Sequence, residues 1–197
     1  QQALAAATGI IANSRATANA IAAFARSRGL ATPPILGALL GAPRLPVPAA
    51  RAVPQRPTFV CLSTIEQRKN HMLLLDVWQG LIARFGENAP RLLLIGRWGV
   101  CSQTVRKRYL SDPQLRRFVT VHTNCSDAEM VHHLSTARAL LAPSRAEGFG
   151  LPVVEALKLG VPVIASDLPV FREVGGDVPT FLDPDAPEAW LRTVQDF

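Results

Sequence analysis

The 197-residue chain is long enough to bury the core of one full domain and part of a second. Its hydrophobic content of 48% and charged content of 18% are typical of a folded protein and exclude a disordered one. The net charge of +6 permits binding of nucleic acid, anionic lipid or a phosphorylated ligand without choosing among them.

Other features of the sequence narrow the cellular setting. Three scattered cysteines without CxxC spacing argue against a disulfide framework and favour a reducing cytoplasm. No apolar run is long enough to span a bilayer, and the N-terminus lacks the basic start and apolar core of a signal peptide. Because helical sequence runs to both ends of the chain, we expect a piece of a longer protein, truncated at its C-terminus.

The first 57 residues are predicted to hold two parts. Residues 1–30 are expected to form a helix, a short strand at 9–12 and a second helix that ends near Gly29, which is too little for a domain. Residues 31–57 contain seven prolines and no sustained periodicity, so they predict an extended interdomain linker.

From residue 58 to 197, apolar strand-like runs alternate with helical segments. We expect strands at 59–63, 92–96, 118–121, 139–142, 162–165 and 180–182, and helices at 72–85, 103–110, 127–136 and 152–159. Strands without polar alternation predict a doubly wound α/β domain, a parallel sheet covered by helices on both faces. Ligands of such sheets bind beyond the carboxyl ends of the strands, which makes the loops there the candidate site.

The loop after strand 139–142 has the composition of an anion site. Gly148 and Gly150 allow close approach of the backbone to a ligand, and Pro152 suits the first position of the following helix. Free amides near the start of that helix are expected to point at an anion: Leu151, Val153 and Val154.

Two acids flank this loop. Glu147 lies at its start and Glu155 in the first turn of the helix, so both can converge on one ligand bound over the helix end. Ionised carboxylates only accept hydrogen bonds, which suits neighbouring hydroxyls of a ribose or a hexose.

The segment RAEGFGLPVVEALKLGVPVIASDLPVFREV resembles the signature of retaining GT-B glycosyltransferases of family GT4. The resemblance implies that 58–197 is the Rossmann-like, nucleotide-sugar-binding C-terminal half of a GT-B fold and that 1–30 is a remnant of its N-terminal domain. It also implies that Glu155 binds the ribose of the donor and that Glu147 contacts its hexose. The backbone that would approach the sugar and the diphosphate comprises Gly148, Phe149, Gly150 and Leu151.

A second segment, CLSTIEQRKNHMLLLDVW, is similar to the family's diphosphate-binding segment and implies that Lys69 stabilises the departing nucleoside diphosphate. The family usually has Gly-Arg where this chain has Ser63 and Thr64, and Arg68 is expected to substitute in part. With a lysine and a helix terminus neutralising the leaving group, we expect neither a metal nor a cofactor.

The resemblance implies transfer of a hexose from a nucleoside diphosphate sugar to a saccharide or lipid-linked acceptor in polysaccharide biosynthesis. GDP-mannose is the first expectation for the donor and UDP-glucose the second. Because most of the N-terminal domain is absent, the chain should bind donor better than it transfers sugar. The resemblance places the protein in the bacterial cytoplasm, with peripheral contact to the inner membrane face left open.

Two other classes of function remain open. One is a non-catalytic nucleotide-sugar-binding module, and the other is a basic nucleic-acid-binding protein, which the low aromatic content of 6% disfavours. The basic residues concerned are Arg106, Lys107, Arg108, Arg116 and Arg117, which also suit a solvated face or an anionic membrane. Glu147 and Glu155 could also be the acid and base of a glycosidase, but their place on one loop suited to binding phosphate argues against that function.

Metal binding is not expected. Asp183-Pro-Asp185 matches the DxD pattern of another glycosyltransferase fold, but a turn and a helix N-cap explain it more simply. The histidines at 71, 122, 132 and 133 are interpreted as solvated or core residues. His71 and His122 have no partner at ligand spacing, and His132 and His133 are adjacent on a helix and cannot share one face. The end of the strand at 118–121 could still contact the base or the sugar through His122, Thr123 and Asn124. Ser126 to Glu129 form a predicted capping box.

Overall fold

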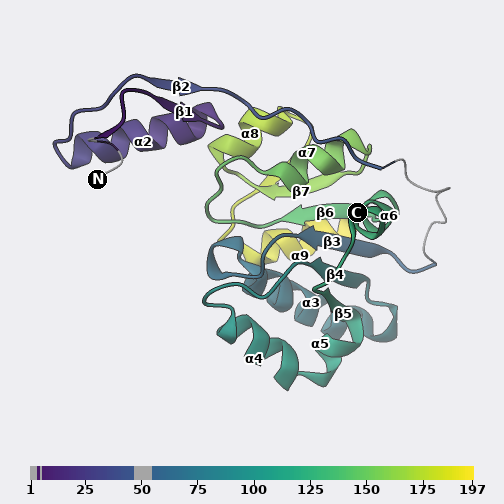
Figure 1. Cartoon of the computed structure of the whole chain (residues 1–197). Helices are drawn as coiled ribbons and strands as arrows, with labels where there is room; N and C mark the ends of the chain where they lie inside the picture. The colour runs from purple at the N-terminus through teal and green to yellow at the C-terminus, as the bar shows by residue number, and fades with distance from the viewer. Residues whose placement is uncertain (1–3, 5, 47–54) are drawn as a thin grey trace.

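The computed structural model describes residues 4, 6–46 and 55–197. Most of these residues form one parallel sheet with helices on both faces (Figure 1). The order of its strands is β5-β4-β3-β6-β7-β8. Their bounds are β3 (Thr58–Leu62), β4 (Arg91–Ile95), β5 (Val119–His122), β6 (Ala139–Ala142), β7 (Val163–Ser166) and β8 (Thr180–Leu182). The doubly wound α/β fold is confirmed.

Helices cover the two faces of the sheet in two groups. One face packs against α3 (His71–Phe85), α4 (Gln103–Ser111), α5 (Pro113–Phe118) and α9 (Pro187–Asp196). The other packs against α6 (Asp127–Ser135), α7 (Leu151–Lys158) and α8 (Pro169–Gly175). Short 3-10 turns are η1 (Gln67–Lys69) and η2 (Gly86–Asn88).

Alternate residues of each strand enter opposite cores. In β3, Phe59 and Cys61 belong to the core under α3, whereas Val60 belongs to the core under α6 and α7. Because both faces are buried, the strands are apolar throughout, as their unbroken hydrophobic runs predict.

The strand order reverses between β3 and β6. These strands pair directly, with Phe59 opposite Ala139 and Val60 opposite Leu140, although the chain builds β4 and β5 between them. The loops that follow them therefore lie side by side at the carboxyl edge of the sheet, which is the binding position in folds of this order.

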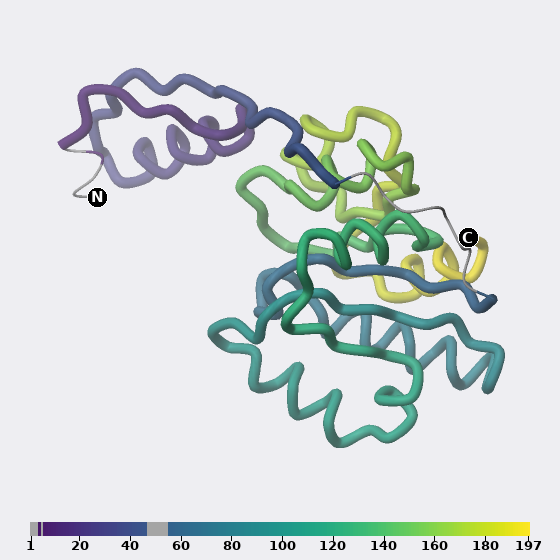
Figure 2. Tube along the Cα trace, turned by 45° about the vertical axis from the view of Figure 1, so that its right-hand side comes forward, coloured from purple at the N-terminus to yellow at the C-terminus, as the bar shows by residue number. Residues whose placement is uncertain are grey.

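A small N-terminal unit precedes the sheet and consists of β1 (Ile10–Ala12), α2 (Arg15–Ser27) and β2 (Ile35–Gly37). Figures 1 and 2 show it set to one side of the sheet, next to α8, against which α2 packs. β2 pairs in parallel with β1, so residues 31–46 are not simply the extended linker that their prolines predict. The pairing depends on a partner strand, which local composition does not reveal. Residues 47–54 of the linker, and most of the helix expected before residue 8, lie outside the described residues.

Most predicted elements are present within one to three residues of their expected ends, but two helices were not expected. α5 begins at Pro113 after Asp112, whose carboxylate accepts hydrogen bonds from the amides of Gln114 and Leu115 at 2.9 and 3.1 Å. This Asp-Pro start was a readable signal. α8 has seven residues and no side-chain cap, so its sequence carries few of the signals by which a helix is recognised.

None of the helices in the described ranges has the length and hydropathy needed to cross a bilayer.

Gly96, directly after β4, sets the position of the loop after β3. Its φ is +152°, and a Cβ there would lie 1.9 Å from the Ser63 carbonyl oxygen. We predict that Gly96→Ala lowers the free energy of unfolding by at least ~1–3 kcal/mol, because backbone atoms must move to relieve the clash. Urea unfolding measures this change. Gly41→Ala is the matched control, since no atom lies within 4 Å of its Cβ position. Equal stabilities of the two variants would show that the close approach imposes no constraint.

Candidate functional site

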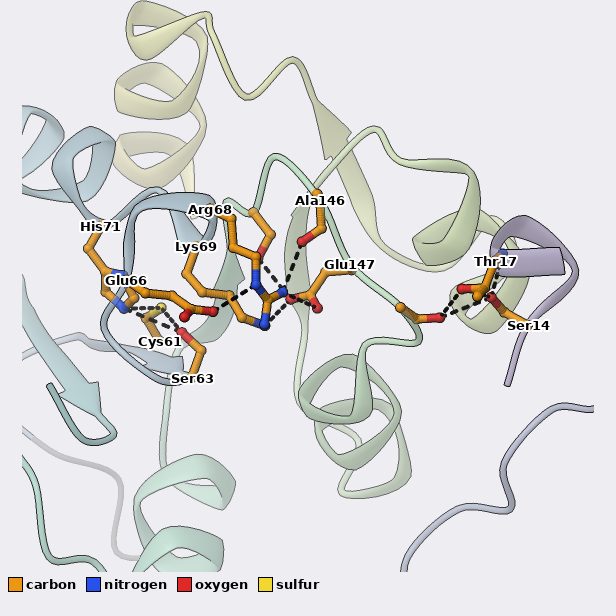
Figure 3. Close-up of polar contacts among 12 residues, drawn as sticks. Ser14, Thr17, Cys61, Ser63, Glu66, Arg68, Lys69, His71, Ala146 and Glu147 are labelled. Atoms are coloured by element: carbon orange, nitrogen blue, oxygen red, sulfur yellow. Dashed lines mark hydrogen bonds and ion pairs between the residues drawn. The ribbon is translucent and has the colours of Figure 1, made fainter. Parts of the chain in front are cut away.

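Lys69 and Glu147 form an ion pair across the point where the strand order reverses (Figure 3). Lys69 ends η1, after β3, and Glu147 lies in the loop after β6, 78 positions later. The Lys69 ammonium donates a hydrogen bond to Glu147 Oε1, and each side chain is only 10% exposed. The structure thus brings together the two residues to which the sequence assigned catalytic roles.

Glu147 has two further partners. The Ser144 hydroxyl donates to Oε1 at 2.9 Å. Arg68 Nη1 donates to Oε2 at 3.3 Å, as Figure 3 shows. Arg68 also bonds the Ala146 carbonyl at 3.2 Å and pairs with Glu66 at 2.7 Å, while half of its side chain stays exposed. Arg68 therefore lies beside Lys69, where a second cation was expected. Ser144 is a residue of the site that no sequence motif indicated.

Contacts between the two loops hold this arrangement. The Arg145 amide donates to the Arg68 carbonyl at 2.8 Å, and the Arg145 guanidinium contacts Asp185 at 2.5 and 3.0 Å. Asn70, in the left-handed region with φ 59°, donates from its side chain to the Pro184 carbonyl at 3.0 Å. The loops after β3, β6 and β8 are thereby tied together.

The Asp183-Pro-Asp185 segment is partly as expected. Asp183 accepts a hydrogen bond from the Asp185 amide at 2.8 Å, which confirms the turn. The N-cap part of the interpretation is wrong, because Ala186 caps α9 and no side-chain cap bond forms. Asp185 instead pairs with Arg145, which draws its carboxylate toward the loop after β6.

A neutral cluster lies beneath the loop after β3. His71 Nε2 lies 3.3 Å from Ser63 Oγ and 3.8 Å from Cys61 Sγ. Burial lowers the pKa of His71 to about 4 and raises the pKa of Cys61 to about 12, so both groups are uncharged at neutral pH. The side chains of His71 and Cys61 contact Ser63 from the core side of the loop. The Cys61 thiol is not ionised and therefore cannot act as a nucleophile. Thr64, next along the loop, is exposed.

The start of α7 differs from the anion site expected there. The helix begins at Leu151, and Val153 and Val154 donate to the Gly150 carbonyl at 3.0 and 3.3 Å. Their amides are therefore used by the first helical turn, and the expectation that they face an anion is wrong. Among the described residues, the amides of Gly150 and Leu151 have no hydrogen-bond partner and remain available.

Gly150 and Phe149 have structural reasons for their identity. Gly150 has φ +93°, and a Cβ there would lie 2.6 Å from the Phe171 ring. The Phe149 and Val153 side chains are buried, so neither side chain is available to a ligand. Gly148 is exposed.

Glu155 lies half-buried on α7, where burial, and then the nearby Asp127, raise the pKa of its carboxyl group. Because Asp127 is the first residue of α6, the loop between β5 and α6 lies near Glu155. Ser126 and Glu129 form the predicted capping box at this helix start.

His122 ends the outermost strand, β5, and Thr123 and Asn124 follow it. No hydrogen bond in the described residues joins these three side chains to Lys69 or Glu147. The expectation that His122 has no partner at ligand spacing is wrong. A ligand atom of His122 lies within 4.8 Å of ligand atoms of Cys125 and His133, because α6 brings His133 back over the strand end.

The N-terminal unit holds the loop after β6 from outside. The hydroxyls of Ser14 and Thr17 each donate to the Gly148 carbonyl at 2.9 Å (Figure 3). The Glu173 carboxylate accepts hydrogen bonds from the amides of Arg15 and Ala16 at 2.8 and 2.9 Å. The sequence did not reveal these contacts, because they join residues that lie far apart in the chain.

Two spaces adjoin Glu147. A cleft of about 900 Å³ lies between α2 and the loop after β6. Its lining is mainly apolar but includes the charged side chain of Glu147. The hollow between Ser63, Ser144, Glu147 and Gly150 measures only about 10 Å³ while the Lys69–Glu147 pair is formed.

Several of the basic side chains outside the site are paired. Arg108 lies 3.9 Å from both Asp76 and Asp112, and Arg117 pairs with Glu87 at 2.5 Å. These pairs weaken the electrostatic attraction that a nucleic-acid-binding face requires, and that alternative is not favoured.

The comparisons with known proteins agree with this geometry. Residues 56–197 match the family model described as glycosyl transferases group 1. The chain is 32% identical over 141 residues to the serotype-specific mannosyltransferase WbdA of Escherichia coli, covering 72% of this chain and 17% of that protein. It is 38% identical over 84 residues to the O-antigen chain mannosyltransferase RfbU of Salmonella typhimurium, covering 43% of this chain and 24% of that protein. The chain thus spans less than a quarter of the length of either relative.

Solved structures share the fold at lower identity. The sucrose-phosphate synthase of Thermosynechococcus elongatus superposes with a TM-score of 0.76 and 23% identity, covering 98% of this chain and 49% of that chain. TarM superposes with a TM-score of 0.72 and 14% identity, covering 99% and 37%. These likenesses support the expected C-terminal half of a GT-B fold. Together with the family match, they lead to the conclusion that the chain belongs to the glycosyl transferases group 1.

Proposed function

We propose that this chain is the donor-binding part of a retaining glycosyltransferase that moves a hexose from a nucleoside diphosphate sugar to a hydroxyl of a saccharide or lipid-linked acceptor. The observation that carries the proposal is the buried Lys69–Glu147 pair at the reversal of strand order. A pair of this kind contributes little net stability, since desolvation offsets the attraction. A binding role explains its position better.

Lys69 is proposed to bind the diphosphate and to stabilise the charge that grows on it as the bond to the sugar breaks. Its ammonium has three donors, so it can turn toward phosphate oxygens while Ser144 and Arg68 keep their bonds to Glu147. The small hollow beside the pair implies that donor binding shifts the Lys69 side chain. Arg68, half-exposed, would meet the same phosphates from the solvent side.

Glu147 is proposed to orient the hexose. Its carboxylate lies between the diphosphate position at Lys69 and the cleft under α2. In the proposed reaction the bond from the anomeric carbon to the diphosphate oxygen breaks. The acceptor hydroxyl oxygen bonds the same face of that carbon, and its proton passes to the departing diphosphate. The acceptor would enter through this cleft, whose apolar walls help to exclude water.

Glu155 is proposed to accept hydrogen bonds from the two ribose hydroxyls, with the amides of Gly150 and Leu151 on the phosphates. GDP-mannose is the proposed donor, supported by the names of WbdA and RfbU as mannosyltransferases. UDP-glucose is the second candidate. In this proposal two cations and two free amides would meet the diphosphate, so we propose that it needs no Mg²⁺.

Calorimetric titration of the chain with GDP, UDP and ADP tests the proposal. We expect GDP to bind most tightly, with the same affinity whether Mg²⁺ or EDTA is present. Lys69→Met should weaken GDP binding by ~10-fold or more, since a hydrogen bond to a charged group contributes about 1.5–3 kcal/mol. Lys107→Met, a substitution of an exposed lysine on α4, is the control and should bind normally. Failure of the parent chain to bind any nucleotide would exclude a donor site.

The role of Glu147 is separable from that of Lys69. Glu147→Gln should bind GDP as well as the parent chain or better, because Lys69 no longer has a competing carboxylate partner. We expect the same variant to lose most of the gain in affinity that the mannose unit adds to GDP. The measurement compares GDP with GDP-mannose in both proteins. A mannose contribution that survives the substitution would assign sugar orientation to another residue.

Glu155 should show a trade between stability and binding. The pKa of Glu155 is raised in the folded chain, so ionisation of its carboxyl group lowers the free energy of unfolding once the pH exceeds the ordinary glutamate pKa. This loss of stability is recovered as the pH falls through the raised pKa. Glu155→Gln should therefore raise the melting temperature at pH 7 while it weakens GDP binding. In the parent chain, GDP affinity should fall on acidification through the same range, because a protonated carboxyl loses acceptor capacity.

Glu188→Gln is the control for this experiment. Glu188 is exposed in the first turn of α9, where a negative charge stabilises the helix, so its loss should not raise the melting temperature. A Glu155→Gln variant that binds GDP normally would remove Glu155 from the proposed site.

A further inference from the structure

A second group of chemically reactive side chains lies away from the Lys69–Glu147 pair. It consists of His122 at the end of β5, Cys125 in the following loop, and His133 on α6. One ligand atom from each lies within 4.8 Å of the other two, and all three residues are half-buried. The rings of His122 and His133 meet edge to face, with centroids 5.7 Å apart at 73°.

Local chain geometry produces this group. The capping box at Ser126 starts α6 immediately after Cys125, and Glu129 lies one turn before His133 on the same helix face. That face is directed back over the end of β5, since the Glu129 carboxylate interacts electrostatically with both His122 and His133. Three side chains, two imidazoles and one thiol, therefore converge from a strand end, a loop and a helix.

The chemistry of the group matches a zinc-class ion. Two imidazole nitrogens and one thiolate are ligands that Zn²⁺ prefers, with bonds of about 2.0–2.1 Å to nitrogen and about 2.3 Å to sulfur. Tetrahedral geometry at those lengths brings ligand atoms to about 3.4–3.6 Å from one another. Modest side-chain rotations would close the observed spacing to that value. The acids Asp127 and Glu129 lie near Cys125 and favour a cation there.

We propose that His122, Cys125 and His133 bind one divalent ion of the zinc class, with a fourth position left to water or another ligand. The ion fastens the end of β5 to α6 and thereby stiffens the loop that lies near Glu155. The Lys69–Glu147 pair takes no part in the site, so the proposal stands apart from the donor chemistry. The alternative is that no ion binds, in which case the His122 and His133 rings simply pack edge to face beside the Cys125 thiol.

The test uses the full chain without a histidine tag, stripped of metal by EDTA and exchanged into chelator-free buffer. Zn²⁺ affinity and stoichiometry are measured by competition with a colour-forming chelator, and Co²⁺ serves as a spectroscopic substitute. We expect one ion per chain, a thiolate-to-cobalt charge-transfer band, and a rise in melting temperature on addition of Zn²⁺.

Matched variants identify the ligands. Cys125→Ser and His133→Gln should each weaken Zn²⁺ binding by at least ~10-fold, the effect of losing even an outer-shell partner. Cys101→Ser and His132→Gln should bind normally, since Cys101 and His132 are exposed and outside the group. Circular dichroism confirms that each variant is folded.

A measurement on the unsubstituted chain covers the case in which a variant fails to fold. Zn²⁺ should slow alkylation of Cys125 by iodoacetamide, with the exposed Cys101 as the internal control in the same digest. The proposal is overturned if the parent chain binds no Zn²⁺, if the Co²⁺ complex lacks the thiolate band, or if Zn²⁺ protects both cysteines equally.

Discussion

The direct parallel pairing of β3 with β6 is the constraint on which the site depends. Phe59 pairs with Ala139 and Val60 with Leu140, although β4, β5 and their helices separate the two strands along the chain. Because the chain continues from β3 and from β6 toward opposite edges of the parallel sheet, no other strand end lies between the loops after these two strands. Lys69 and Glu147 meet for that reason.

The environment of this pair explains how it can serve a charged ligand. Each side chain is 10% exposed, so the charges are largely withdrawn from water and their interaction is strong, yet the pair adds little to stability once desolvation is counted. Ser144 and Arg68 supply Glu147 with bonds that do not involve Lys69. The lysine can consequently exchange partners without leaving a buried carboxylate unsatisfied.

The N-terminal unit acts on the same loop from its other side. Ser14 and Thr17 hold the Gly148 carbonyl, and Glu173 holds the first amides of α2. These are polar, directional contacts at the border of the 900 Å³ cleft, so a movement of α2 would be transmitted to the backbone next to Glu147. Segments joined by a few polar contacts of this kind can move relative to one another.

The sequence by itself determined the class of fold and the elements of the sheet, because unbroken apolar runs such as Leu92 to Ile95 can only be buried on both faces. Two local segments of the sequence also predicted Lys69, Glu147 and Glu155 as site residues, through their resemblance to a known family. Only the tertiary structure decided the contacts between residues distant in the chain. These are the pairing of β2 with β1 and the hydrogen bonds from Ser14 and Thr17 to the Gly148 carbonyl. It also decided the close approach of His122, Cys125 and His133. It also decided that the amides of Val153 and Val154 serve the helix, since the first turn begins one residue earlier than Pro152 suggested. Hydrophobic periodicity records which side of an element is buried, but it carries no information about which distant backbone group or side chain will be its partner.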